Sequence, residues 1–495
     1  IIAAAQHVAK TDGLHAVYIS NFRCGPDSFV WHYITEELKG KPFLHLEVDE
    51  HSADAGMVTR IEAFLDSLRG TEKKERKEVR VFRPRPGLSS PSKERTLYFP
   101  YMNDGAYMIA AAARSIGVHS EVLPRQTEED IAIGRKYTSS KECFPMICTT
   151  GSFIKKLSEP GADPSKMCFF MPDHNGPCRF GQYNQFHRIL FDRLGFEKAE
   201  LITPSNDTSY EDLAGEHGQK FRIRAWKGFV AADYIRKIHR EIRPYEINRG
   251  DSDRLYDDAI HRLERCIEKG AGGLHRVLAG IAGDFIAIPV DRSIRKPVVG
   301  VIGEIFMRDN AGCNGNISNR LEELGLEVVV GPFFEWIVYS THRFTRDSIW
   351  KNDTKGIIKS KIQGAGQEVI SMMLLRGIRK FTDHEKDVSL HDMLRLSNRY
   401  VSEFYDGDPP IALGTSVALA ERGISGMAAI LPFTCMPGTL VASLSDSFRK
   451  DHDNIPFINI AYDGQDSVSL DTRLQAFAFQ VKEYSGSKQA AVQSV

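Results

Sequence analysis

The chain has 495 residues, which is enough for about three domains of ordinary size. Its 64 Lys and Arg residues balance 65 Asp and Glu residues, so we expect no general attraction to nucleic acid or to an anionic membrane. No apolar stretch approaches the roughly 18 residues of a spanning helix, and no secretory leader is evident, which predicts a cytoplasmic protein. The first ten residues resemble the end of an amphipathic helix and include no Met, so we expect the chain to be part of a longer polypeptide.

Residues 1–70 have the pattern of the C-terminal half of an α/β unit, and this pattern recurs near the end of the chain. Thr59 follows Cys24 by 35 positions and Thr472 follows Cys435 by 37, each at the start of a Thr-Arg-x-x-Ala-Phe sequence. The two segments are therefore expected to be copies of one half-unit. The predicted strands and helices alternate over residues 16–22, 27–38, 42–49 and 58–64 in the first copy, and over residues 428–434, 439–448, 456–463 and 471–477 in the second.

Between these copies, residues 71–95 are charged and then rich in Pro and Ser, which is typical of a linker. This is also the most basic stretch, so an arm that binds nucleic acid is the alternative, although acidic residues are mixed in. Alternating strand and helix patterns predict parallel sheets in residues 96–211 and 296–495, including a helix over residues 391–405. A 3.6-residue period predicts a mainly helical segment over residues 212–295. The expected fold is α/β, with several Rossmann-like parallel-sheet domains and a helical insert.

Four of the eight cysteines share one local pattern, in which a strand ends, a Cys follows among Gly, Pro or Asn, and a helix begins. They are Cys24, Cys178, Cys313 and Cys435. Ligands of open α/β sheets bind at the carboxyl ends of the strands, where helix N-termini offer N–H groups to anions. Taken singly, each of these cysteines is as readily explained by burial beside a turn. Taken together, they predict thiols that converge on one metal site between the domains.

Cys143 and Cys148 form a second candidate pair. Pro145 and the Thr149-Thr150 pair suit a turn that leads into a helix over residues 152–157. By contrast, Cys168 lies in a predicted buried strand, and Cys266 lies in a predicted helix, where both are expected to be structural. Zinc and an iron–sulfur cluster can both use scattered thiolates, but the six candidates outnumber the ligands of one tetrahedral zinc ion.

Five segments carry a resemblance to a known family, and together they span nearly the whole chain. They are residues 21–29 (NFRCGPDSF), 46–56 (LEVDEHSADAG), 176–183 (GPCRFGQY), 309–314 (DNAGCN) and 433–438 (FTCMPG). These segments resemble the large proteins of the 2-hydroxyacyl-CoA dehydratase and activator superfamily. In large members an ATP-hydrolysing activator module precedes a part like this one, and the chain contains no Gly-Lys-Thr/Ser phosphate loop.

The resemblance implies a cofactor and a set of ligands. Relatives are either acyl-CoA dehydratases with one [4Fe-4S] cubane or proteins with a double-cubane [8Fe-9S] cluster on six thiolates. Six candidates resemble the second group: Cys24, Cys143, Cys148, Cys178, Cys313 and Cys435. Some members carry Cys at the position of Met146, so Cys148 and Cys168 both remain candidates for the sixth ligand.

By the same resemblance, the chain is expected to be the reductase component of an ATP-dependent, low-potential electron transfer to a small substrate in an anaerobic setting. Electrons would come from an ATPase activator with its own [4Fe-4S] cluster, which is either a separate protein or a preceding part of the polypeptide, and a homodimer is expected. The alternatives are a 2-hydroxyacyl-CoA dehydratase subunit and a non-catalytic iron–sulfur carrier. Polar residues near the ligands are candidates for proton delivery or substrate binding: His174, Arg179, Gln182, Glu304 and Arg308.

Overall fold

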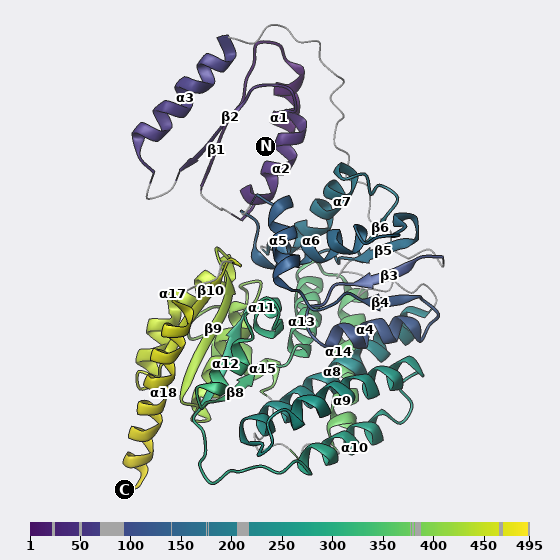
Figure 1. Ribbon diagram of the computed structural model, residues 1–495, viewed down its shortest axis with the longest axis vertical. Helices are drawn as coiled ribbons and strands as arrows, with labels where there is room; N and C mark the ends of the chain where they lie inside the picture. The colour runs from purple at the N-terminus through teal and green to yellow at the C-terminus, as the bar shows by residue number, and fades with distance from the viewer. Residues whose placement is uncertain are drawn as a thin grey trace.

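The computed structural model describes residues 1–21, 25–48, 52–69, 94–139, 141–174, 176, 178–204, 217–376, 378, 381, 388–464 and 469–493. Its strands form three sheets, and every pair of neighbouring strands within a sheet is parallel. The predicted α/β class is therefore confirmed. We name the parts that hold these sheets the half-unit (residues 1–69), the central unit (residues 94–204) and the C-terminal unit (residues 296–493). In Figure 1 the half-unit projects from the top of the molecule.

The central unit and the C-terminal unit have the same strand topology. The central sheet has the order β4-β3-β5-β6 and the C-terminal sheet has the order β10-β9-β7-β8, so strands numbered along either unit lie in the order 2-1-3-4. The third strands, β5 and β9, are buried at every position, as expected for apolar strands covered on both faces.

The elements of the central unit are β3 (Thr96–Phe99), α4 (Gly105–Arg114), β4 (Ser120–Val122), α5 (Glu128–Tyr137), α6 (Phe144–Leu157), η1 (Pro164–Lys166), β5 (Met167–Phe170), η2 (Arg179–Gln182), α7 (Tyr183–Arg193) and β6 (Glu200–Ile202). Those of the C-terminal unit are β7 (Val298–Gly303), α11 (Ile305–Asp309), α12 (Ile317–Glu323), β8 (Glu327–Val330), α13 (Phe334–Trp350), α14 (Thr354–Leu375), α15 (Leu390–Ser397), α16 (Pro409–Glu421), β9 (Gly426–Pro432), α17 (Met436–Asp451), β10 (Phe457–Tyr462) and α18 (Leu470–Gln493).

The half-unit contains only the last two strands of this topology. Its elements are α1 (Ile2–Lys10), β1 (Val17–Asn21), α2 (Asp27–Glu37), β2 (Leu44–Val48) and α3 (Asp54–Arg69). They follow the order of α16, β9, α17, β10 and α18, and β1 pairs with β2 as β9 pairs with β10. The order of elements that suggested a repeat in the sequence is therefore the order in the structure.

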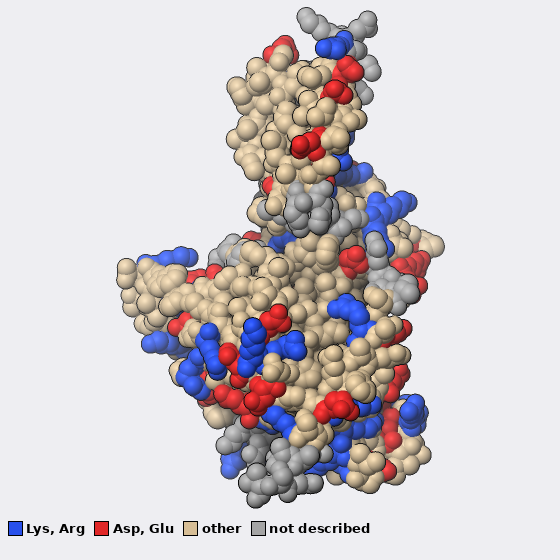
Figure 2. Space-filling view, turned by 90° about the vertical axis from the view of Figure 1, so that its left-hand side faces the viewer, with Lys and Arg blue, Asp and Glu red and all other residues tan. Residues whose placement is uncertain are grey.

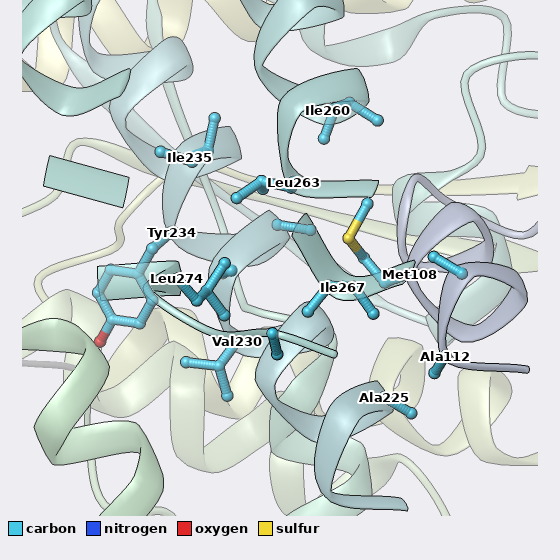
Figure 3. Packing of buried hydrophobic residues seen from close by; sticks show 14 of the residues in the cluster. Met108, Ala112, Ala225, Val230, Tyr234, Ile235, Ile260, Leu263, Ile267 and Leu274 are labelled. Carbon is cyan, nitrogen blue, oxygen red and sulfur yellow. The ribbon is translucent and has the colours of Figure 1, made fainter. Parts of the chain in front are cut away.

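Between the two complete units lies a set of helices, α8 (Gly218–Ile242), η5 (Arg243–Tyr245), α9 (Asp251–Glu268) and α10 (Leu274–Ile286). They share one hydrophobic core with α4 and with strands of the central sheet. Figure 3 shows Met108 of α4 among the aliphatic side chains of α8, α9 and α10. These helices thus cover one face of the central sheet.

The expected helix over residues 391–405 is wrong in its second half, because α15 ends at Ser397. The Ser397 carbonyl accepts hydrogen bonds from the N–H groups of Tyr400 and Val401, which turn the chain. Both side chains then pack against the core of the C-terminal unit, and this packing outweighs their helical spacing. Within the described residues, no helix combines the length and the apolar character that crossing a membrane requires.

Candidate functional site

Three of the predicted cysteines lie where the chain leaves neighbouring strands of a 2-1-3-4 sheet. Strands 1 and 3 are adjacent there and their connections depart in opposite directions, which opens a crevice at their carboxyl ends. Cys178 follows β5, whereas Cys313 and Cys435 follow β7 and β9. Cys24 follows β1 in the sequence, but it lies outside the described residues. A cysteine thus follows the third strand of both complete units, β5 and β9, and the equivalent strand β1 of the half-unit.

Cys143 and Cys148 lie on the helix that precedes the third strand of the central unit. Cys143 is the N-cap of α6 and Cys148 lies inside the helix, with Pro145 in its first turn, where proline is well accommodated. The predicted turn that ends before a helix at residue 152 is therefore wrong, because α6 already begins at Phe144. Both thiols are buried.

Cys148 and Cys313 bring the central and C-terminal units into contact. Their Sγ atoms lie 3.0 Å apart, and both are free thiols. The loop that carries Cys313 is fixed to the central unit by Asn310, whose Nδ2 donates to Gln126 Oε1 at 2.9 Å. Cys148 also belongs to the same hydrophobic core as β7 and β9. Helix α6 of the central unit and the loop after α11 of the C-terminal unit therefore meet at a pair of sulfur atoms.

Electrostatic coupling links the other thiols to this pair. Burial raises the pKa of Cys148, and the charges of Cys313 and Cys143 raise it further. Burial likewise raises the pKa of Cys178, with a smaller effect from Cys143, and raises that of Cys435, with a smaller effect from Cys178. Cys148, Cys178 and Cys435 thus each respond to the charge of another thiol, Cys148 to Cys313 and Cys143, Cys178 to Cys143, and Cys435 to Cys178. Because burial raises the pKa of these three thiols, they would release protons on binding a metal.

Two half-buried carboxyl groups lie beside these thiols. Glu304 is the N-cap of α11 and accepts hydrogen bonds from the N–H groups of Phe306 and Met307 at 3.1 and 2.9 Å. Burial and the nearby charge of Asp408 raise the pKa of Glu304, and burial raises that of Asp408. The charges of both carboxyls in turn raise the pKa of Cys435. The site therefore holds protonatable oxygens next to its sulfur atoms.

A pocket opens beside Asp408. Arg308 is buried, its Nη2 donates to the carbonyl of Pro332 at 3.2 Å, and its Nε forms an ion pair with Asp309 Oδ2 at 3.8 Å. The Arg308 guanidinium and the Asp408 carboxyl thus give the pocket a donor and an acceptor between apolar walls. The residues that line it are Gly303, Ile305, Arg308, Trp336, Asp408, Ile411 and Ala412.

Arg179 ties the cysteine loops together. Its Nη1 donates to the carbonyl of Lys141 at 3.1 Å, just before Cys143, and its Nη2 donates to the carbonyl of Thr434 at 2.9 Å, just before Cys435. The side chain is buried, and its positive charge lowers the pKa of Cys143 against the larger effect of burial. This geometry fits a residue that positions the ligand loops of both units.

Two further polar candidates, His174 and Gln182, lie within a few residues of Cys178 in the sequence. Gln182 ends η2 and accepts a hydrogen bond from the hydroxyl of Tyr33 at 3.3 Å. The ring of His174 lies 6.1 Å from that of Phe180, centre to centre, and its backbone N–H donates to Asp173. Both residues therefore lie near the candidate site, and a role in its chemistry stays a prediction.

The half-unit reaches this site through α2. His32 of α2 contacts the buried carboxylate of Glu142, the residue before Cys143. Burial would raise the pKa of Glu142, but the hydrogen bonds from His32 and from the Ser139 N–H hold it below its ordinary value. The segment that follows Cys24 is thus attached to the helix start that carries Cys143.

The remaining cysteines lie elsewhere. Cys168 is buried on β5 within the core shared with the helices, and Cys266 lies on α9 with its Sγ 3.6 Å from the carbonyl of Gly272. Both match the structural roles expected from the sequence. The predicted linker, residues 71–95, lies almost entirely outside the described residues.

Sequence reasoning missed two side chains of the site, Tyr183 and Asp408. The Tyr183 hydroxyl lies 2.5 Å from Cys143 Sγ. Asp408 is the N-cap of α16, the helix before β9, just as Cys143 is the N-cap of α6, the helix before β5. The signal for Asp408 was an Asp followed by two prolines at a helix start. No local signal marks Tyr183.

No protein-family model matches this chain, and no curated protein sequence does. Among the residues that the structure describes, no three His, Cys, Asp or Glu side chains lie close enough to share one metal ion. Thiolates that hold an iron–sulfur cluster bind different irons and are spread around the cofactor. Four buried thiols and the half-buried Cys178 come from two units, and Cys143 and Cys435 stand at helix starts with free N–H groups, which is a donor set suited to such a cluster.

Proposed function

We propose that this chain is the iron–sulfur reductase component of an ATP-dependent, low-potential electron transfer to a small substrate. One observation carries the proposal: Cys148 of the central unit and Cys313 of the C-terminal unit have their Sγ atoms 3.0 Å apart, while Cys178 responds to the charge of Cys143, and Cys435 to that of Cys178. The local sequence pattern and the family resemblance add Cys24 to these ligands, and the resemblance adds an ATP-hydrolysing partner as the source of electrons. We further propose that the protein is a homodimer in the cytoplasm.

The cluster would be a double cubane on these six thiolates, with a single [4Fe-4S] cubane as the alternative. When bound, it would supply low-potential electrons one at a time. The protein supplies the surroundings. Cys143 and Cys435 are the N-caps of α6 and α17, whose first N–H groups would stabilise negative charge on sulfur.

The polar residues divide into two proposed roles. Arg179 is a positioning residue, because its guanidinium bonds to the carbonyls that precede Cys143 and Cys435 rather than to the pocket. Glu304 and Asp408 hold protons beside Cys435, where a reduction would need them. Arg308 and Asp408 line the pocket in which a substrate would bind.

Anaerobic purification with iron and acid-labile sulfide analysis tests the proposal, together with electron paramagnetic resonance of the reduced protein. Cys313→Ser and Cys435→Ser should each lower the iron content and change the resonance signal. Cys266→Ser is the matched control, since this thiol lies on α9 in the helical segment. Protein that holds only stoichiometric zinc, or iron that is indifferent to Cys313 and Cys435, would contradict the proposal.

Cys148 and Cys168 can be compared in the same assay. Cys148 touches Cys313, whereas Cys168 lies on β5 in the hydrophobic core, so we expect iron to depend on Cys148 and not on Cys168. Cys148→Ala and Cys168→Ala make the same chemical change, so the iron contents of the two variants can be compared directly. Iron loss only in Cys168→Ala would reverse the assignment of the sixth ligand.

A further inference from the structure

The half-unit and the C-terminal unit bury equivalent helices very differently. Thr59 of α3 corresponds to Thr472 of α18, which aligns Ile61 with Leu474 and Leu65 with Ala478. In α18 these two positions are 1% and 3% exposed. In α3 they are 38% and 47% exposed, and no residue of α3 is buried. Helix α3 therefore keeps the apolar residues of α18, but among the described residues nothing buries them as their equivalents in α18 are buried.

The same contrast holds for the strand beside this helix. Counted back from the cysteine that follows, Val17 and Ile19 of β1 correspond to Ala428 and Ile430 of β9. The two β9 residues are fully buried, whereas Val17 and Ile19 are 52% and 64% exposed. Their neighbours on β2, which include Leu46 opposite Ile19, are buried. The exposed apolar surface thus runs from the outer edge of β1 onto α3.

In the C-terminal unit, the first half of the unit covers the equivalent surface. β7 pairs with the outer edge of β9, and its side chains pack with Ala428, Ile430 and the buried face of α18 in one core. Helix α12 and strand β8 belong to the same core. Among the described residues, the half-unit has only β2 beside β1, and no strand takes the place of β7.

The surface of the half-unit around α3 carries few charged side chains (Figure 2), as expected for a surface that another segment covers. Figure 2 looks onto the side of the half-unit that carries α3, and most of the surface of this lobe shows neither acidic nor basic side chains. The body below it carries many charged side chains in the same view. The exposed side chains of Val17, Ile19, Ile61 and Leu65 make part of this uncharged surface apolar, and exposed apolar patches mark interaction sites.

We propose that the apolar face formed by Val17, Ile19, Ile61 and Leu65 is the docking site of a strand–helix–strand segment that completes the half-unit. The occupant adds a parallel strand to the outer edge of β1, in the place that β7 has beside β9. Its helix packs against α3, in the place that α12 has near α18. The occupant is a polypeptide of the same architecture as β7–α12–β8, and this inference does not depend on iron.

To test this proposal, a second copy of residues 295–332 is fused to the N-terminus of the full chain, ahead of Ile1, through a flexible Gly/Ser linker. This added segment carries β7, α11, α12 and β8. Leu65→Cys serves as a reporter, with its labelling by a thiol reagent read by mass spectrometry of the α3 peptide. Docking should slow labelling at residue 65 by at least about tenfold and protect the amides of Val17–Asn21 from hydrogen exchange.

Two controls separate docking from a general change. Thr59→Cys lies on the opposite side of α3, and its equivalent Thr472 is exposed in the complete unit, so its labelling should not change. An added segment carrying Val299→Asp and Val301→Asp should protect nothing, because these side chains form the core side of β7. Unchanged labelling of Leu65→Cys in the joined protein would overturn the proposal. Protection that is already present in the unjoined chain and is lost on dilution would also overturn it, since a second copy would then cover the face.

Discussion

The central unit and the C-terminal unit share the strand order 2-1-3-4 but approach the site with different chemistry. The central unit begins the helix before its third strand with a thiol, Cys143, and the C-terminal unit begins the equivalent helix with a carboxyl, Asp408. After the first strand, the C-terminal unit has Glu304 as an N-cap and then Cys313. The same position of the fold thus holds a thiol in one unit and a carboxyl group in the other.

The two units also hold their site helices in a similar way. A Cβ atom at Gly151 of α6 would lie 1.7 Å from the carbonyl oxygen of Asp130 in α5, and one at Gly414 of α16 would lie 2.1 Å from that of Met393 in α15. Both glycines let two helix backbones touch. The difference between the units is therefore one of side chains placed on a common frame.

Gly151→Ala and Gly414→Ala give the largest expected effect, because the added methyl meets backbone that has no room to move aside. We expect each to lower the free energy of unfolding by about 3 kcal/mol or more, measured by urea denaturation. Gly151→Ala displaces the helix of Cys143 and Cys148 and should also lower iron content, whereas Gly414→Ala moves a helix without a ligand cysteine and should spare more of it.

Gly283→Ala on α10 is the control for these variants, since a Cβ there meets no atom within 4 Å. It should be neutral or slightly stabilising, because alanine favours helix more than glycine does. Equal iron loss in Gly151→Ala and Gly414→Ala would show that the two units do not differ in what their helices contribute.

The sequence predicts the elements that depend on local patterns. Strand, cysteine and helix start recur because the residues after a parallel strand decide how the chain turns, and Cys178, Cys313 and Cys435 therefore lie where expected. The element order of the half-unit also follows from its similarity to residues 428–477. These features involve neighbours within a few residues, where periodicity and capping are informative.

Contacts between distant segments were not predictable in this way. Nothing near His32 indicates that it meets Glu142, which lies 110 positions later. The start of α6 was missed because every residue from Phe144 to Ile154 is buried, so this stretch shows no alternation of apolar and polar faces. The apolar pattern of α3 predicts a helix with one buried face, but a pattern cannot tell which other segment covers that face.

The next largest expected effect is on the pH dependence of stability, and it comes from the buried carboxyl group of Glu335. Burial raises the pKa of Glu335 from 4.5 to about 8, while Arg308 lowers it and Asp233 raises it. The folded state therefore keeps a proton that the unfolded chain releases, so this contribution to stability is complete below pH 4.5 and is lost as the pH rises through 8. Glu335→Gln should flatten this dependence and exceed the parent in unfolding free energy at pH 9 by roughly 2 to 3 kcal/mol. Glu368→Gln, on the exposed side of α14, is the control, and an unchanged pH slope in Glu335→Gln would contradict the assignment.

A buried carboxylate of the central unit should show the opposite dependence. Hydrogen bonds from His32 and Ser139 outweigh burial and lower the pKa of Glu142, so its contribution is present above pH 4.5 and is lost as the pH falls. Glu142→Gln removes a charged acceptor and should cost about 2 kcal/mol at neutral pH. Because Glu142 also attaches α2, proteolysis within the half-unit should become faster. The exposed strand residue Glu121 provides the control variant Glu121→Gln, and an unaffected cleavage rate in Glu142→Gln would show that other contacts hold the half-unit.

The smallest effect concerns the phenol beside the first thiol. The Tyr183 hydroxyl and Cys143 Sγ are 2.5 Å apart in the buried interior, and burial raises the pKa of both groups. Tyr183→Phe keeps the packing of the ring against Phe29 and removes one hydrogen bond, so we expect a loss of about 1 kcal/mol in unfolding free energy. If sulfur binds iron here, the same change should shift the reduction potential of the cluster, because hydrogen bonds to ligand sulfur tune it. Tyr137→Phe on α5 is the matched variant. A stability loss without any shift in potential would mean that Tyr183 serves the fold of the central unit alone and that Cys143 does not bind the cluster.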